Sequence, residues 1–205
     1  MHRDAGRHDL ALELANEAVA LARDVSDRRV EADALNTLAT VHRCQARLSQ
    51  AVGHHERALH LAQEATNDYS AVAALTGLAV AHVQLARTEQ AEPAETYAGQ
   101  AITLARRCGY VDLEGHAQTA LAAVHLAQDR LQQACRHGRR ALKVHGDTGH
   151  RLGEANAHLV VGQALHRRGS VAADKHLQRA LALFAAIGTP PPVSILDGGE
   201  GLSCS

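Results

Sequence analysis

The stretch LNTLATVH, from Leu35 to His42, recurs as LTGLAVAH from Leu75 to His82 and as QTALAAVH from Gln118 to His125. The first, fourth, fifth and eighth positions of each copy share one face of a helix. Leucine and alanine dominate that face, and a histidine closes it each time. The repetition predicts equivalent helices that pack through the same stripe.

A second pattern consists of two alanines separated by six residues, with branched apolar residues after the second alanine. Successive copies of this pattern lie 40, 43, 40 and 39 residues apart. Alanines on one face let two helices approach closely, so this segment predicts a second helix packed on the first. The alanine pairs are Ala11 and Ala18, Ala51 and Ala58, Ala94 and Ala101, Ala134 and Ala141, and Ala173 and Ala180.

Each unit is therefore expected to be a helical hairpin, and the whole fold to be all-α. The polar segments SDRR, TNDY, GYVD and HGDTGH supply capping and turn residues before the first helix of successive units. The three extra residues of the longest unit fall in the loop TEQAEPA. The expected helices are 7–24, 28–45, 48–65, 69–86, 91–107, 111–128, 131–145, 151–168 and 170–187.

The order Leu-x2-Leu-Ala, a turn, then Ala-x6-Ala resembles the tetratricopeptide repeat (TPR), from Ala5 to Ile187. The resemblance implies a right-handed superhelical solenoid of antiparallel hairpins with about nine helices. The period is nearer 40 than the usual 34, which is similar to the long repeats of bacterial multidomain signalling and transcriptional regulators. HEAT or armadillo repeats of similar length remain alternatives. Histidine stands where TPR motifs often have an aromatic ring.

Composition narrows the class of protein. The 205 residues are 46% hydrophobic but only 2% aromatic, and the formal net charge is -1. We expect a core of leucine, alanine and valine, and no direct binding of nucleic acid or an anionic membrane. The sequence has no signal peptide or membrane-span pattern, which predicts a cytoplasmic chain with reduced cysteines. Lysine occurs only twice, which is typical of a GC-rich bacterial genome.

The 15 histidines do not form a metal-site pattern, because no two are three or four residues apart. His42, His82 and His125 are expected to pack between helices. The sequence also lacks the usual hydrolase, metalloprotease and nucleotide-binding motifs. We therefore predict no catalytic residues, no bound metal and no cofactor, with an enzyme or metal-binding protein as a remote alternative.

Partner binding is expected on the flank of each first helix, because the TPR resemblance implies a concave surface there. In this hypothesis Val80, Val83 and Leu126 receive an apolar segment, while Arg43 and His166 contact its polar ends. Ordinary packing between helices is the alternative for these positions. The flank residues are Asn36, Thr40, Arg43, Thr76, Val80, Val83, Thr119, Ala123, Leu126, Leu159, Gln163 and His166.

The predicted function is a non-catalytic protein–protein interaction module or scaffold, the TPR region of a bacterial regulatory or signalling protein. A receptor domain that senses a peptide or a small ligand is the alternative. The basic run from Cys135 to His145 is expected to be a solvated face, with contact to an acidic partner as the other possibility.

The expected domains are a TPR-like array at 1–188 and a disordered Pro/Gly-rich tail at 189–205. The turn AGRHD would truncate the first repeat and leave the helix at Leu10 to Leu21 without its partner. At the other end Leu181, Phe184 and Ile187 finish the array without a polar capping helix. Because solenoids need capped ends, we expect a homo-oligomer or an additional domain to cover an exposed end.

Overall fold

The computed structural model describes residues 2–85 and 92–191, and all regular structure in these two ranges is helical. The predicted all-α fold of nine helices is confirmed within them. The helices are α1 (His2–Asp24), α2 (Arg28–Cys44), α3 (Leu48–Glu64), α4 (Asp68–Leu85), α5 (Glu92–Cys108), α6 (Val111–Ala127), α7 (Leu131–Thr148), α8 (Arg151–Arg167) and α9 (Ala173–Ile187).

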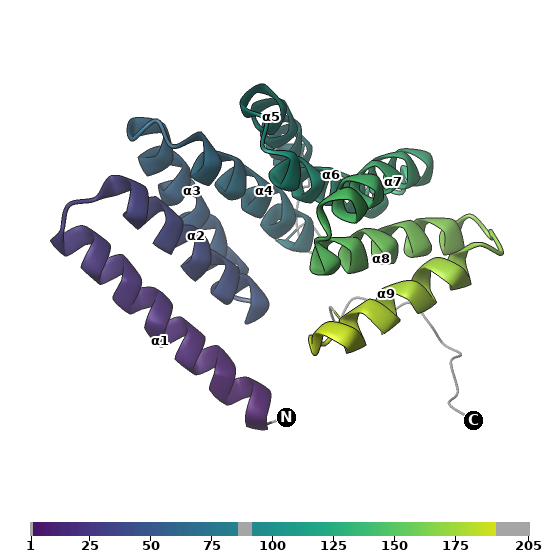
Figure 1. Ribbon diagram of the computed structural model, residues 1–205, viewed down its shortest axis with the longest axis horizontal. Coiled ribbons are helices and arrows are strands. Elements are labelled where there is room, and N and C mark those ends of the chain that lie inside the picture. The colour runs from purple at the N-terminus through teal and green to yellow at the C-terminus, as the bar shows by residue number, and fades with distance from the viewer. Residues whose placement is uncertain (1, 86–91, 192–205) are drawn as a thin grey trace.

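The helices form two rows that curve together into a solenoid (Figure 1). Each helix packs on the next one in the sequence. In addition, α2, α4, α6 and α8 contact one another in succession, whereas α1, α3, α5, α7 and α9 make no such contacts within the described residues. In a curved array the helices on the inner side lie closer together than those on the outer side. Because α2, α4, α6 and α8 contact one another, they form the inner row.

Alanines and leucines fill the space between the rows. Leu35 and Leu38 of α2 are almost fully buried, and the alanine pairs of α3, α5, α7 and α9 are buried as well. In α1 the pattern differs, because Ala18 is exposed and Ala15, Val19 and Ala22 are buried instead. In the described structure α1 packs only on α2, so its other side stays open to solvent.

Short turns join the helices and require backbone that turns left-handed. Gly109 and Gly149 supply it after α5 and α7, with φ of 73° and 69°. Ser26 and Thr66 occupy the equivalent places after α1 and α3 with φ of 56° and 50°. Side chains complete the next helix start: Asp27 accepts hydrogen bonds from the backbone amides of Arg29 and Val30. At these turns the chain reverses direction within two or three residues.

Three predicted helix ends are wrong. The turn expected at AGRHD is helical, because α1 starts at His2 and a single glycine costs an α-helix only about 1 kcal/mol. Helix α7 continues to Thr148, where Gly149 ends it. Helix α9 starts at Ala173, since Ser170 forms a turn through its backbone carbonyl and hydroxyl.

Other expectations fall partly or wholly outside the described residues. Most of the loop TEQAEPA lies in residues 86–91, which are outside the described ranges. The predicted tail, 189–205, is outside them from residue 192 onward.

At the C-terminal end, Phe184 is buried with Leu159 and Leu183, whereas Leu181 is 43% exposed. The expectation of an open apolar end therefore fails for Phe184 and holds for Leu181.

Candidate binding surface on the inner helices

The predicted flank residues all lie on the inner helices α2, α4, α6 and α8. Their accessibility differs along the array. Thr40 of α2 and His166 of α8 are exposed, while Arg43, Val80 and Gln163 are partly buried. The inner surface therefore offers only some of the predicted side chains to a partner.

Two of the predicted residues, Asn36 and Thr119, contact histidines of the outer helices. Asn36 donates a hydrogen bond from Nδ2 to the Ser70 carbonyl at 3.0 Å, and its Oδ1 lies 3.0 Å from Nδ1 of His55. Thr119 Oγ1 lies 3.0 Å from the Gly115 carbonyl and 3.2 Å from Nε2 of His145. The alternative of ordinary helix packing describes Asn36 and Thr119.

Leu126 and Leu159 belong to the core rather than to the surface. They are 8% and 5% exposed, and Leu126 packs with Ala122, Val161 and Leu165. The prediction that Leu126 receives a partner segment is corrected here: α6 turns this position toward α8. A helical wheel cannot show this, because the direction of the next helix sets which flank is covered.

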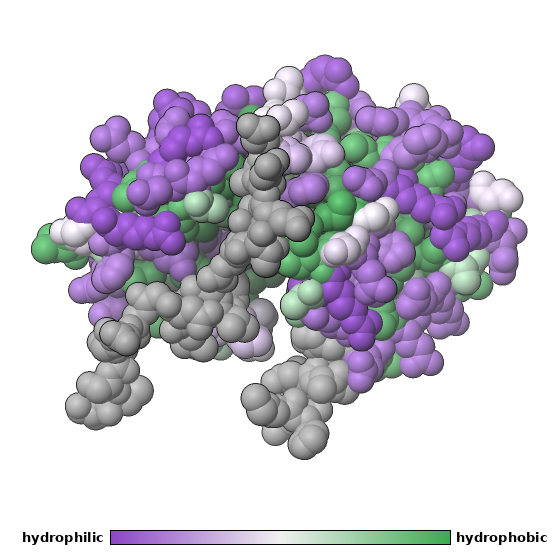
Figure 2. All heavy atoms as spheres, turned by 180° about the vertical axis from the view of Figure 1, so that it is seen from behind, coloured by the Kyte–Doolittle hydropathy of each residue, from purple (hydrophilic) through white to green (hydrophobic). Residues whose placement is uncertain are grey.

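The middle of the inner surface is apolar and formed of small side chains. Val80 and Val83 of α4 are partly buried and pack against the largest core cluster, which includes Leu75 and Leu121. Ala123 of α6 is partly buried too. Hydrophobic residues gather toward the middle of the molecule, and hydrophilic residues along its periphery (Figure 2).

The histidines at the end of each repeated stripe pack against a ring of the following outer helix. The ring centroids of His42 and His54 lie 5.1 Å apart, and those of His82 and Tyr97 lie 5.6 Å apart. Burial lowers the pKa of His42 and of His82, because a less polar environment disfavours the charged imidazolium. The rings of His125 and His137 also lie close, with centroids 5.2 Å apart, but they are tilted by 41° rather than stacked. The predicted packing role is confirmed at these positions.

The sequence patterns did not reveal a second set of histidines, on the outer helices, which reach between the inner helices. The ring of His55 lies where a Cβ at Gly77 would be, 2.2 Å from the nearest ring atom. His145 fills the same kind of space over Gly153, where that distance is 2.4 Å. Glycines inside otherwise helical stretches were the signal, because such positions often mark close packing.

His145 also belongs to a group of three rings with His116 and His150, whose centroids lie 4.5 to 5.5 Å apart. Internal contacts occupy two of the nitrogens: His145 Nε2 faces Thr119, and His150 Nδ1 accepts a hydrogen bond from the Gly153 amide at 2.9 Å. Among the described residues, no group of three or more histidine, cysteine, aspartate or glutamate side chains has the arrangement of a metal site.

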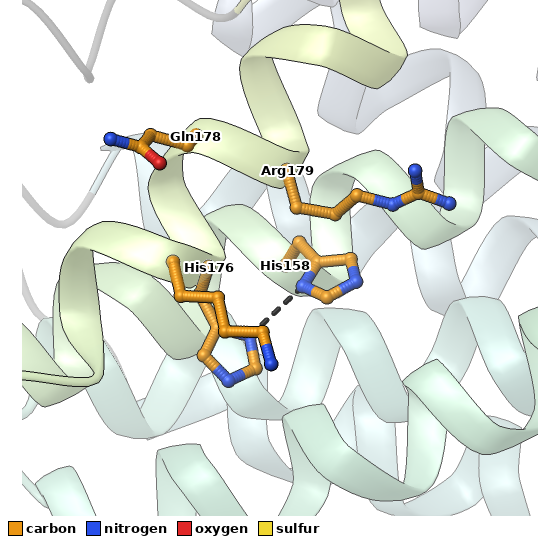
Figure 3. Close-up of a pocket in the computed structure, with 5 residues that line it drawn as sticks. His158, His176, Gln178 and Arg179 are labelled. Atoms are coloured by element: carbon orange, nitrogen blue, oxygen red, sulfur yellow. Dashed lines mark hydrogen bonds between the residues drawn. The ribbon is translucent and has the colours of Figure 1, made fainter.

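A shallow depression between α8 and α9 carries a further pair of imidazoles (Figure 3). Nδ1 of His158 and Nδ1 of His176 lie 2.9 Å apart, so one ring donates its proton to the other. Burial lowers the pKa of both rings. Arg179 reaches across to Glu154 at 3.2 Å, and Lys175 and Gln178 complete the lining.

The N-terminal part of the chain matches a known repeat family. Residues 1–64 match the family model described as tetratricopeptide repeat. The family match thus covers the first 64 residues, and the remaining described helices continue the same TPR-like solenoid. This match and the fold favour the TPR expectation over the HEAT and armadillo alternatives. Helices of the inner row begin at Arg28, Asp68, Val111 and Arg151, so the hairpins of this TPR array recur at intervals of 40, 43 and 40 residues.

Solved structures share the solenoid fold of the TPR array. BtubC (BKLC) from P. vanneervenii is 19% identical, with a TM-score of 0.67 over 99% of this chain and 81% of that chain. The nearly identical TPR-like repeats of a Podospora anserina protein described as a kinesin light chain are 16% identical, with a TM-score of 0.58 over 91% of both chains. A variant of those repeats with one substitution gives a TM-score of 0.60. No curated protein sequence matches the chain.

The described helices of the TPR array are too short or too polar to cross a membrane. The cysteines Cys44, Cys108 and Cys135 are free, and Cys108 donates to Asp68 at 3.2 Å. Cys204 lies outside the described residues.

Proposed function

We propose that this TPR array is a protein-interaction module that takes an apolar segment of a partner protein on its inner surface. TPR repeats generally mediate contacts between proteins, and the fold is typically non-catalytic. An inner row of helices offers a continuous surface to an extended peptide or to a helix. We assign the chain no catalytic activity of its own.

The apolar middle of the inner surface is the observation that carries the proposal. Val80 and Val83 are anchored by the core beneath them and are still partly open to solvent. Their positions are therefore fixed before a partner arrives, which lowers the entropy cost of binding. Arg43 on α2 and His166 on α8 lie toward the two ends, so a segment with an apolar centre and polar flanks is complementary.

We also propose that the array works in the cytoplasm as part of a bacterial regulatory or signalling protein. Low lysine content and the long repeat support this context. Leu10, Leu14 and Leu21 of α1 are more than half exposed and share one helical face. A second copy or an attached domain packed on that face would remove this apolar surface from water.

The test uses charge substitution at the apolar middle. Peptides selected from a random display library on the native chain should bind the Val83→Asp variant at least about tenfold more weakly, because a carboxylate must be desolvated in the apolar surface. Val171→Asp is the matched control, since Val171 is 97% exposed in the turn before α9. Circular dichroism shows whether both variants fold. Equal binding of the selected peptides by a folded Val83→Asp variant would refute the proposal.

A further inference from the structure

Helix α7 carries four basic side chains in one exposed stripe. Arg136, Arg139, Arg140 and Lys143 occupy positions i, i+3, i+4 and i+7 and therefore share one face. The buried residues of α7, among them Ala134, Ala141 and His145, lie on the opposite face. The stripe thus faces solvent on the outer side of the array, away from the inner surface.

These four cations have no carboxylate within ion-pair distance among the described residues. Arg136 has a 3.4 Å contact with Nε2 of the neighbouring His137, a partner without negative charge. Elsewhere in the described structure, eight arginines form ion pairs with carboxylates: Arg23 and Arg57 with Glu31, Arg28 with Glu64, Arg106 with Glu114, Arg107 with Asp68, Arg130 with Glu95, Arg167 with Asp129, and Arg179 with Glu154.

The stripe is electrostatically unfavourable by itself. Like charges three and four residues apart on a helix repel each other by a few tenths of a kcal/mol per pair. One carboxylate, that of Asp147, lies on the same face of α7. It is exposed and four residues beyond Lys143, at the C-terminal end of the stripe. An external group of negative charge would relieve this repulsion, and exposed arginines can hold carboxylates through paired hydrogen bonds.

The positive surface continues from α7 toward α9. Burial is the largest cause that lowers the pKa of His176. The positive charges of Arg139 and Lys175 lower this pKa further. Lys175, His176 and Arg179 line the depression between α8 and α9 (Figure 3). Glu154 neutralises Arg179 in part, so the charge of this surface comes mainly from α7 and Lys175.

We propose that the basic face of α7, together with Lys175 of α9, is a docking surface for an acidic segment of a partner polypeptide. This surface lies on the outer row and is separate from the inner surface of Val80 and Val83. The stripe runs from Arg136 to Lys143 and spans about 10 Å along the helix, which matches a short run of acidic residues.

Two observations favour an acidic polypeptide over a nucleic acid. The chain has a net charge of -1 despite this stripe, so the rest of the molecule is net negative and repels a long polyanion. The stripe also carries no aromatic side chain, and single-stranded nucleic acids are usually held by bases stacked on aromatic rings. A short acidic segment needs only the local charge.

The experiment measures fluorescence anisotropy with the full chain and a labelled peptide of alternating glutamate and serine at low ionic strength. We expect saturable binding that weakens with added salt, and none to the counterpart peptide with glutamine in place of glutamate. The variant Arg139→Glu/Arg140→Glu should lose about tenfold or more in affinity, and Arg139→Gln/Arg140→Gln somewhat less.

The matched control is Arg47→Glu/Arg151→Glu, which changes the net charge equally at two exposed arginines outside α7. It should retain affinity within about twofold, and Val83→Asp should bind the acidic peptide normally. An equal loss in the Arg47/Arg151 control would show that only overall charge matters and would overturn the proposal. So would the absence of saturable binding, or tighter stripe-dependent binding of a single-stranded oligonucleotide than of the peptide.

Discussion

The substitution Gly77→Ala tests the close packing of an outer-row histidine on an inner helix. A Cβ at Gly77 would lie 2.2 Å from Cε1 and 2.3 Å from Nε2 of His55, far inside contact distance. His55 is 2% exposed, and its Nδ1 is 3.0 Å from Oδ1 of Asn36. The ring therefore cannot move aside without breaking this hydrogen bond or displacing α4.

The expected change in stability is the balance of three effects. Replacing glycine by alanine inside a helix stabilises it by about 1 kcal/mol. Overpacking a buried site costs about 1 to 3 kcal/mol, and losing the bond between His55 and Asn36 costs about 1 kcal/mol more. We expect a net loss of about 1 to 3 kcal/mol, which lowers the melting temperature of a chain of this length by about 2 to 12 °C.

Thermal unfolding followed by circular dichroism at neutral pH measures this effect. Gly99→Ala on α5 is the matched control, because no atom lies within 4 Å of the added Cβ. It should raise stability by up to about 1 kcal/mol. In a His55→Ala background, Gly77→Ala should become stabilising, since the clash is gone. A Gly77→Ala variant as stable as the parent, with His55 present, would refute the reasoning.

Three further predictions concern charge and capping. Burial, the largest cause, lowers the pKa of His55, His137 and His145 from 6.5 to about 4, so their neutral forms stabilise the fold above pH 6.5 and this stability is lost as the pH falls toward 4. Each should contribute a loss of about 2 kcal/mol between pH 7 and pH 5, seen as a falling melting temperature; an unchanged value would contradict it. Glu31→Gln should destabilise the chain by about 1 kcal/mol in urea unfolding, and less at high salt, because Glu31 bonds Arg23 and Arg57. Asp27→Ala should lower the urea midpoint by the equivalent of about 1 kcal/mol, since it removes the cap of α2, whereas Asp27→Ser should retain most of the stability.

Helix type and order were predictable because periodicity is a local property of the sequence. The stripe of Leu35 and Leu38 needs a helix to become one continuous face, and this face is buried as expected. Helix ends were less predictable. Gly6 reads as a turn residue, yet α1 continues through it, because one glycine costs less than the hydrogen bonds on both sides provide.

The candidate binding surface was likewise predictable only where it depends on spacing along one helix. The positions of Val80 and Val83 on the inner row follow from repeat register, and both pack there on the core. Leu126 has the equivalent register to Val83, but it is buried against α8. Likewise, the sequence indicates that Asn36 and Thr119 are polar surface residues. In the structure they contact His55 and His145 of the outer row. Contacts of this kind depend on residues 19 to 26 positions away in the chain.

The sequence by itself determined the repeat, the helical class and the place of each histidine that ends a stripe, since these depend on spacing along one helix. The tertiary structure decided which flank each helix exposes, which glycines lie under an imidazole and which cations stay unpaired. These properties depend on how closely neighbouring helices approach and at what angle they cross. The spacing of residues within one helix does not determine how neighbouring helices approach. The packed array is therefore needed to distinguish the unpaired basic residues of α7 from the arginines that form ion pairs elsewhere.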